Sequence, residues 1–338
     1  MARTAVVLMN LGGPDSLEAV QPFLFNLFSD AAIIRLPAVW RLPLARLISW
    51  RRARVARGIY ARLGGGSPLL ANTEAQARAL EAALGSGHRC FVAMRYWHPT
   101  SSETARSVAD WAPEEIVCLP LYPQFSTTTT ASSLAAWQDA AARLGLDRLS
   151  RVVCCYPREK GFVETLAGLI RSVLDLAFGL EKRPRLLLTA HGLPKKIVSA
   201  GDPYPDQVES TATALIAALN RPGIDWQVCY QSRVGPLEWI GPATDDEIRR
   251  AGRDRVPLVV APISFVSEHS ETLVELDLNY RHLAETSGVP AYYRVPTVGV
   301  EPGFIESLAS LVRRAGTGEP VGGCMSHRRR CALSGSPG

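Results

Sequence analysis

Two predicted strand ends carry the residues best suited to chemistry. The stretch FVSEHSETL presents Glu268, His269 and Glu271 directly after the apolar run VPLVVAPI. A second apolar run, RLLLTA, ends at His191. In an open sheet of parallel strands, ligands bind outside the carboxyl ends of the strands. Imidazole and carboxylate groups at such ends predict a site that handles a divalent metal ion, protons, or both.

Each of these residues also has a simpler explanation. His191 precedes Gly192 and Pro194 in a turn, where a surface histidine would be ordinary. Glu271 begins a predicted helix, where a carboxylate stabilises the helix dipole without any catalytic role. On that helix His269, two residues away, would point away from Glu271 and act as a supporting group. The strand-end position favours the functional interpretation of His191.

Other predicted strands also end in polar and aromatic groups. These are Arg95-Tyr96-Trp97-His98, Tyr122-Pro123-Gln124-Phe125-Ser126 and Tyr230-Gln231-Ser232-Arg233. We expect the strand ends of two lobes to line a shared cleft whose composition suits a flat, apolar ligand with carboxylates at its edge. Arg95 at such a rim is a natural bidentate partner of a carboxylate. The alternative is that it pairs with an acidic residue of the protein.

Eight short runs rich in Val, Ile and Leu predict the strands that position these groups. They span residues 5–11, 90–96, 115–122, 151–156, 185–190, 226–231, 256–263 and 289–295. Helical spacing over 72–84 and 102–112 predicts helices between them. This alternation predicts an α/β fold of two Rossmann-like lobes, each with a four-stranded parallel sheet flanked by helices. The expected parts are residues 1–149 with a lip at 31–70, residues 150–300, a helix at 301–316 packing back on the first lobe, and a cysteine-containing tail at 317–338.

Composition narrows the class of protein. A chain of 338 residues predicts two domains, and 47% hydrophobic with 20% charged residues is ordinary for a globular protein. No apolar run reaches the about 18 residues of a spanning helix, and the first residues resemble a strand more than a signal peptide. We therefore expect a cytoplasmic protein. No dinucleotide or phosphate-loop motif follows the first predicted strand, which argues against nucleotide binding.

A segregated basic segment is the strongest feature of the charge distribution. Residues 31–73 contain no Asp or Glu, and eight arginines lie from Arg35 to Arg62, alternating with Trp40, Trp50 and several leucines. Such a segment predicts a basic amphipathic helix that rests on an anionic membrane or receives acidic substrate groups. The alternative is an ordinary surface helix in an arginine-rich protein. No nucleic-acid-binding motif accompanies the charge, so we expect no nucleic acid partner.

Seven stretches, in order along residues 5 to 300, carry a resemblance to a known family. They are NLGGPDS, GGGSPL, MRYWHP, LPLYPQFSTTTTASSL, TAHGLPKKIVSAGDPYPDQV, CYQSRVGPLEWIGPATDDEI and APISFVSEHSETLVELD. Together they resemble the ferrochelatases, the terminal enzymes of haem synthesis. The resemblance implies insertion of Fe²⁺ into protoporphyrin IX to give haem b with loss of two pyrrole protons. It also implies two Rossmann-like lobes.

The resemblance implies roles for individual residues. His191 and Glu271 would face the metal-insertion point, with Glu268 and His269 as supporting groups on a polar track. Porphyrin neighbours would be Leu11, Arg52, Tyr60, Ser67, Arg95, Tyr96, Tyr230 and Phe265. A neutral imidazole with a pKa of about 6.5 accepts a proton at physiological pH. A nitrogen–oxygen pair would hold Fe²⁺ weakly, as suits a metal that is handed over. Whether His191 binds iron or only takes protons stays open.

The tail GGCMSHRRRCALSG raises the question of a [2Fe–2S] cluster. Some ferrochelatases bind such a cluster through one internal and three C-terminal cysteines. Here the candidate ligands are Cys154 or Cys155, Cys324 and Cys331, with His327 as a fourth. The tail is one cysteine short of that pattern, and the alternative is a basic tail with incidental thiols.

Two alternatives to the main prediction stay open. A coproporphyrin III ferrochelatase would need more basic groups for a substrate with four carboxylates. A two-lobed carrier would bind haem or a metal without turnover. The lip could also bring the protein into peripheral contact with the inner membrane. The oligomeric state is undetermined.

Overall fold

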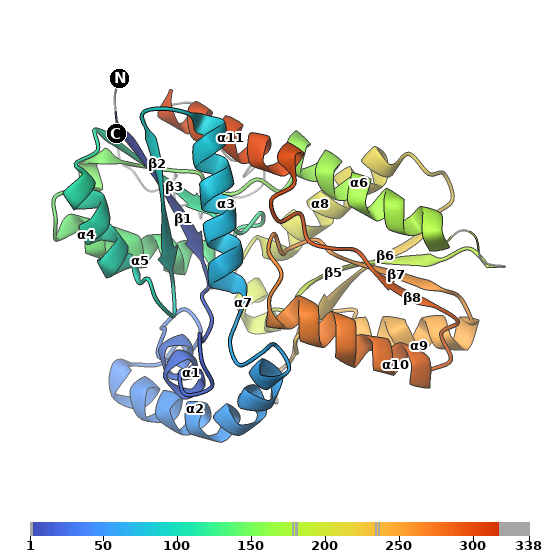
Figure 1. Ribbon diagram of the computed structural model, residues 1–338. Helices are drawn as coiled ribbons and strands as arrows, with labels where there is room; N and C mark the ends of the chain where they lie inside the picture. The colour runs from blue at the N-terminus through green and yellow to red at the C-terminus, as the bar shows by residue number, and fades with distance from the viewer. Residues whose placement is uncertain (1–2, 178, 180–181, 234, 236, 318–338) are drawn as a thin grey trace. The chain divides into compact units, whose positions relative to one another are not determined.

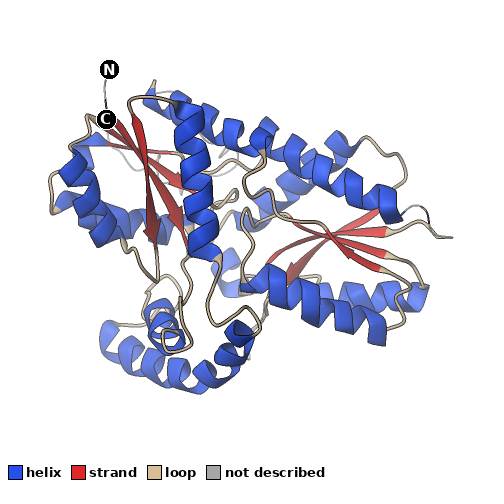
Figure 2. Ribbon diagram, in the orientation of Figure 1, coloured by secondary structure: helices blue, strands red, loops and turns tan. Residues whose placement is uncertain are grey.

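The computed structural model describes residues 3–177, 179, 182–233, 235 and 237–317. Contacts group the chain into two compact units. The first contains Met1–Cys155 and the chain from Leu308 onward, and the second contains Tyr156–Ser307. Each unit is built around a parallel sheet (Figures 1 and 2).

The sheet of the first unit has the strand order β2-β1-β3-β4, all parallel. Its strands are β1 (Thr4–Asn10), β2 (His88–Met94), β3 (Glu115–Pro120) and β4 (Ser150–Val152). Helices α4 (Ser101–Trp111) and α5 (Thr130–Ala142) cover one face, where the buried Trp137 packs, and α3 (Leu69–Leu84) lies on the other (Figure 1). A short 3₁₀ turn, η1 (Asp147–Leu149), precedes β4. Because helices cover both faces, every residue of β1 is buried.

Two further helices of this unit, α1 (Val20–Phe28) and α2 (Ala38–Ala61), pack on each other below the sheet (Figure 1). Their shared core contains Phe23, Leu24, Tyr60 and Tyr96. Helix α2 forms most of the predicted lip at residues 31–70.

The second unit repeats the arrangement with the order β6-β5-β7-β8. Its strands are β5 (Arg185–His191), β6 (Asp225–Gln231), β7 (Leu258–Pro262) and β8 (Tyr292–Arg294). Helices α6 (Lys160–Ala177) and α8 (Tyr204–Leu219) lie on one face. On the other lie α9 (Thr244–Asp254), the π-helix η2 (Glu271–Tyr280) and α10 (Arg281–Thr286). The short helix α7 (Lys195–Ser199) follows β5.

The expected fold class is confirmed, and each of the eight apolar runs overlaps a strand. The expected helices at 72–84 and 102–112 overlap α3 and α4, and the last helix is α11 (Pro302–Gly316). Arg313 of α11 donates a hydrogen bond to the Ala83 carbonyl of α3 at 2.9 Å. None of the described helices is long and apolar enough to cross a membrane.

Candidate active site

The end of β5 and the start of η2 bring an imidazole and a carboxylate into contact. His191 is the last residue of β5, and Glu271 is the first residue of η2. The distance from His191 Nδ1 to Glu271 Oε2 is 2.8 Å. The side chains remain 38% and 23% exposed, so a ligand can reach both. This contact joins two residues that the sequence placed only at separate strand ends.

His269 stands beside this pair and is held by its own contacts. Its backbone N–H donates to Thr272 Oγ1 at 2.9 Å, and its Nδ1 lies 3.1 Å from the Ser267 carbonyl oxygen. The Phe265 ring packs on the imidazole, with 4.8 Å between ring centroids. Its Nε2 lies 4.0 Å from Glu271 Oε1, which is too long for a hydrogen bond. His269 precedes η2, so its ring stays near Glu271, which it would not do on the expected helix.

Glu275, which the sequence analysis missed, completes the polar group. Its two oxygens accept hydrogen bonds from the Ser232 backbone N–H at 2.8 Å, Ser232 Oγ at 2.5 Å, Gln231 Nε2 at 3.1 Å and Tyr280 OH at 3.1 Å. Ser232 Oγ also donates to Glu271 Oε2 at 3.3 Å. Glu271 and Glu275 are four residues apart on a helix, a spacing that places side chains on one face. That four-residue spacing is the sequence signal that could have identified Glu275.

The charges of the group favour an ion pair at its centre. Burial alone would lower the pKa of His191, but the charge and hydrogen bond of Glu271 outweigh burial and raise it above the ordinary value. Burial opposes ionisation of Glu271, yet His191 and then His269 and Ser232 hold its pKa at about 2. Burial and the Glu271 charge raise the pKa of Glu275. The contact therefore favours the imidazolium form of His191 beside the Glu271 carboxylate, whereas the sequence analysis expected a neutral imidazole.

Glu268 lies in a different environment from the polar track expected for it. Its Oε1 accepts hydrogen bonds from Arg294 Nη1 at 2.5 Å and from the Thr297 backbone N–H at 2.9 Å. Burial would raise the pKa of Glu268, but the Arg294 charge lowers it overall. The structure therefore places Glu268 in an ion pair that fastens the chain just before η2.

In the first unit, Arg95 and Tyr96 share an acidic partner that the sequence analysis did not name. Asp30 Oδ2 accepts hydrogen bonds from Arg95 Nη2 at 2.8 Å, from Tyr96 OH at 2.7 Å and from Ser132 Oγ. Arg95 Nε also donates to Ser132 Oγ at 2.6 Å. Asp30 lies 65 residues from Arg95 along the chain, so spacing could not reveal this partner. The alternative that Arg95 pairs with an acidic residue is therefore observed.

The other expected porphyrin neighbours differ in exposure. Tyr60 and Tyr230 are 7% and 3% exposed, and Tyr96 is 2% exposed, so little of these rings is accessible. The partly or fully exposed members of the set are Leu11, Arg52, Ser67, Arg95 and Phe265. Arg52 stacks over the Phe28 ring at 5.6 Å, and Ser67 Oγ accepts from the Leu69 backbone N–H at 3.3 Å. Because each unit is described by itself, the shared cleft stays a prediction.

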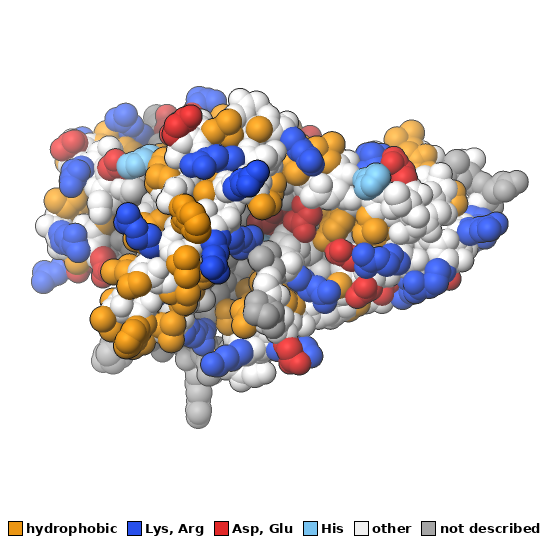
Figure 3. Space-filling model, turned by 90° about the horizontal axis from the view of Figure 1, so that it is seen from below, with side chains coloured by type: hydrophobic (Ala, Val, Ile, Leu, Met, Phe, Trp, Pro, Cys, Tyr) orange, Lys and Arg blue, Asp and Glu red, His pale blue; other side chains and the backbone are white. Residues whose placement is uncertain are grey.

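The predicted basic segment forms a helix with an unusual division of side chains. The buried positions of α2 are the small residues Ala45, Ser49 and Ala53, together with Tyr60. Trp40 and Trp50 are 69% and 66% exposed. The outer surface therefore mixes hydrophobic and basic side chains, as Figure 3 shows from below. Small residues let α2 pack closely, whereas the large apolar groups face outward.

Comparisons with known proteins show the family of this chain. A family model described as Ferrochelatase matches residues 3–316. A protein of Caulobacter vibrioides named Ferrochelatase is 57% identical over 316 residues, which cover 92% of this chain and 90% of the relative. One of Phenylobacterium zucineum with the same name is 58% identical over 312 residues, covering 91% and 90%. The chain belongs to the ferrochelatase family. It is therefore an enzyme of haem synthesis that inserts a metal ion into a porphyrin.

Solved structures support the chelatase fold of this family member. The sirohydrochlorin chelatase SirB from Bacillus subtilis subspecies spizizenii, in complex with cobalt, matches with a TM-score of 0.54 and 12% identity over 93% of this chain and 96% of that one. SirB from Bacillus subtilis with Fe³⁺ matches with a TM-score of 0.51 and 13% identity, covering 93% and 95%. At such low identity the likeness concerns the fold.

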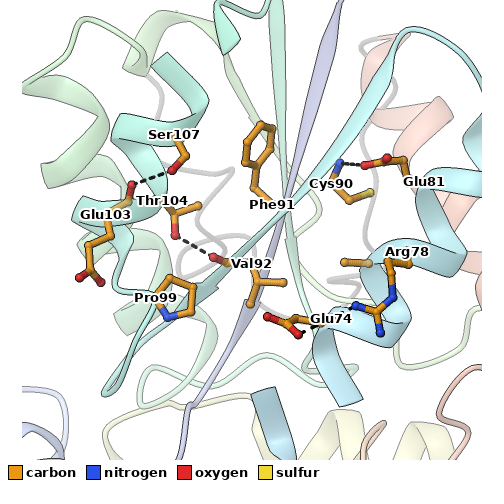
Figure 4. Close-up of a pocket in the computed structure, with 11 residues that line it drawn as sticks. Glu74, Arg78, Glu81, Cys90, Phe91, Val92, Pro99, Glu103, Thr104 and Ser107 are labelled. Atoms are coloured by element: carbon orange, nitrogen blue, oxygen red, sulfur yellow. Dashed lines mark hydrogen bonds and ion pairs between the residues drawn. The ribbon is translucent and has the colours of Figure 1, made fainter. Parts of the chain in front are cut away.

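A hollow of about 430 Å³ in the first unit lies apart from these residues (Figure 4). It opens at β2, an edge strand, between α3 and α4. Glu81 accepts the Cys90 backbone N–H at 2.7 Å, and Thr104 Oγ1 donates to the Val92 carbonyl at 2.7 Å. These side chains satisfy outward-facing backbone groups of the edge strand and so protect it from pairing with another chain. The side chains that line the hollow therefore have a structural role in the fold.

The candidate cluster ligands are only partly described. Cys154 and Cys155 are fully buried and pack with Phe125 in a small apolar cluster. Cys324, His327 and Cys331 lie outside the described residues. Among the residues that the structure does describe, no group of three or more His, Cys, Asp or Glu side chains is arranged to hold a metal ion.

The ion pair predicts how His191 titrates. In a Glu271→Gln variant the pKa of His191 should fall, because an amide cannot stabilise the imidazolium. An NMR titration of the histidine rings measures this change. In the wild type, the stabilisation from the pair should be lost as pH rises through the raised His191 pKa, and also as pH falls towards the Glu271 pKa of about 2.

Glu238→Gln is the matched control, because Glu238 is 83% exposed and lies 3.9 Å from Lys195 in the same unit. It should leave the His191 titration unchanged. An unaltered His191 pKa in Glu271→Gln would show that the two side chains do not form an ion pair in solution.

Proposed function

We propose that the chain inserts Fe²⁺ into protoporphyrin IX, with His191 and Glu271 as the residues that receive the metal and remove protons. The observation that carries this proposal is the 2.8 Å contact between the two side chains at the carboxyl end of the second sheet. The family assignment supplies the reaction class. A nitrogen and an oxygen donor suit Fe²⁺ as a substrate, since two ligands can also release it.

The resting ion pair gives a route for exchanging a proton for iron. When Fe²⁺ approaches Glu271, the dication replaces the imidazolium as the counter-ion of the carboxylate. Its charge also repels the His191 proton, which passes to solvent because the side chain is 38% exposed, and the imidazole becomes neutral. A neutral imidazole can then accept one of the two pyrrole protons as iron enters the ring. His191 therefore serves first as a proton store and then as the base.

Glu275 is the next acceptor along the same helix face. The porphyrin loses two protons for each iron inserted, so one base is insufficient. The raised pKa of Glu275 makes it a better proton acceptor than Glu271, and Ser232 Oγ connects the two carboxylates by hydrogen bonds. His269 Nε2 lies 4.0 Å from the other oxygen of Glu271, and Phe265 packs on the His269 ring.

For the choice of porphyrin, we favour the two-carboxylate substrate. The exposed apolar side chains of α2 suit an apolar macrocycle. Arg95 is already paired with Asp30 and is therefore not an uncommitted basic group. A coproporphyrin substrate would present four carboxylates and need more uncommitted basic groups. A carrier without turnover would bind porphyrin but release no haem.

The test is anaerobic Fe²⁺ insertion with protoporphyrin IX and coproporphyrin III side by side. His191→Ala and Glu271→Gln should each lower kcat by about 10²- to 10⁴-fold, because each removes an acid–base group at the reacting atoms. Glu238→Gln should keep kcat. The porphyrin KM should change little, since neither residue supplies most of the ring contact.

Near-normal turnover in both variants would refute the site. Faster turnover of coproporphyrin III would refute the substrate choice. Porphyrin binding without metallation by the wild type would favour the carrier.

We also propose peripheral contact with an anionic membrane, at the cytoplasmic face of the inner membrane, through α2. Arg46, Arg51, Arg54 and Arg62 are exposed, as are both tryptophans of the helix. Other arginines of the segment are used in packing: Arg41 Nε donates to the Ser29 carbonyl at 2.9 Å and Arg57 Nε to the Leu17 carbonyl at 3.1 Å. The exposed set combines positive charge with aromatic side chains that favour the interface.

Replacing Trp40 and Trp50 together by Asp should lower partitioning onto anionic liposomes at low salt by tenfold or more. Each exposed tryptophan contributes roughly 1.5–3 kcal/mol when it is buried in the interface. Liposome co-sedimentation measures the effect. Leu176→Asp, at a site 68% exposed in the second unit, is the control and should change nothing. Equal partitioning of the double variant and the wild type would refute this contact.

For the tail we propose a [2Fe–2S] cluster with Cys324, Cys331 and His327 as ligands and Cys154 or Cys155 as the internal thiolate. The described part of this set fits incompletely, because both internal thiols are covered by apolar packing. Either thiol becomes available as a ligand only if that packing opens. When bound, the cluster would supply iron–sulfur redox chemistry, and no step of the metal insertion depends on it.

Protein produced with adequate iron should then be brown, with visible charge-transfer bands. The bands should disappear in a Cys324→Ser variant, because one ligand is lost. A visible spectrum and an iron assay of the resting protein measure both. A colourless preparation without iron would end the proposal.

A further inference from the structure

Arg294 connects the two segments that flank Glu271. Its Nε and Nη2 donate to Asp277 Oδ1 and Oδ2 at 2.9 and 2.7 Å, a bidentate pair. Its Nη1 donates to Glu268 Oε1 at 2.5 Å. Glu268 lies three residues before Glu271, and Asp277 lies six residues after it. We propose that Arg294 is a positioning residue of the reaction, which fixes Glu271 by holding the chain on both sides of it.

Arg294, Glu268 and Asp277 form a rigid set of ion pairs. The Arg294 side chain is 12% exposed, and those of Glu268 and Asp277 are 24% and 26% exposed. A planar guanidinium that binds one carboxylate in bidentate geometry and a second through its remaining nitrogen has little freedom to rotate. Arg294 lies at the end of β8, within the parallel sheet. The sheet thus anchors both ends of the segment.

The segment needs such an anchor because of its helix type. Residues Glu271–Tyr280 form a π-helix, a form that is rare and is found mostly as single turns at functional sites. A π-helix of ten residues depends on tertiary contacts, since its own hydrogen bonds do not favour it over an α-helix. A second contact from β8, Tyr292 OH to the Leu276 carbonyl at 2.8 Å, holds the same helix. Loosening Arg294 should therefore move Glu271 relative to His191.

The second unit contains a matched arginine that lacks this connection. Arg185 donates to Asp225 Oδ2 at 2.7 Å and to Asp254 Oδ2 at 2.9 Å, and its side chain is 8% exposed. It also bridges two carboxylates in the same sheet. Arg185 is the first residue of β5 and His191 the last, so the two lie roughly 20 Å apart along the strand. An Arg185→Lys variant therefore loses similar contacts without touching the site.

The experiment compares R294K with R185K in the full-length protein, using Fe²⁺ and protoporphyrin IX. Lysine keeps the charge but cannot hold both carboxylates at once. R294K should lower kcat about tenfold or more with the porphyrin KM within about threefold, because a small displacement of a reacting group is costly. It should also speed amide hydrogen exchange over residues 269–280. R185K should keep kcat within about twofold and leave that exchange unchanged.

Folded R294K with normal kcat would overturn the proposal, and so would an equal loss of kcat in R185K. If R294K does not fold, Glu268→Gln and Asp277→Asn each weaken one contact. Each should then lower kcat roughly threefold to tenfold with faster exchange in the same segment. Unchanged kcat in both would overturn the proposal.

The inference rests on the proposed role of Glu271, and the two can fail separately. If the wild type does not metallate porphyrin, the proposed function is wrong. The exchange data still decide whether Arg294 orders η2. If the wild type is active and R294K matches it, only the positioning role is wrong.

Discussion

The contact between His191 and Glu271 joins residues 80 positions apart, and much of the polar structure of the second unit serves it. A buried carboxylate next to an imidazolium is stable only if its remaining oxygen sites have partners, because an incompletely paired buried charge is costly. Ser232 and His269 lie around Glu271 for this reason.

The π-helix brings a second carboxylate, Glu275, under the same requirement for hydrogen-bond partners. It places Glu271 at its first turn and Glu275 on the same side, where Ser232, Gln231 and Tyr280 donate to the second carboxylate. Burial raises the pKa of Glu275, and the nearby charge of Glu271 raises it further. The two glutamates therefore differ because of their surroundings. Glu271 is suited to a cation, and Glu275 is suited to a proton.

Much of the fold could be predicted from the sequence, because the information is local. Continuous apolar runs such as VPLVVAPI can be strands only where both faces are covered, which requires parallel sheets between helices. His191 and Glu271 could be named because strand ends are where parallel sheets bind ligands. The partners of Arg95 and Glu268 could not be named, because Asp30 and Arg294 lie 65 and 26 residues away. Long-range ion pairs produce no periodic pattern in the sequence.

By itself, then, the sequence determined the strands, the fold class, the family and the residues at the strand ends. Only the tertiary structure decided the contact of His191 with Glu271, the place of Glu275 beside them, the pairing of Arg95 with Asp30 and the outward position of Trp40 and Trp50. The reason is physical. Backbone structure follows from patterns that recur every few residues, whereas pKa values and ion pairs depend on which distant side chains share a buried volume.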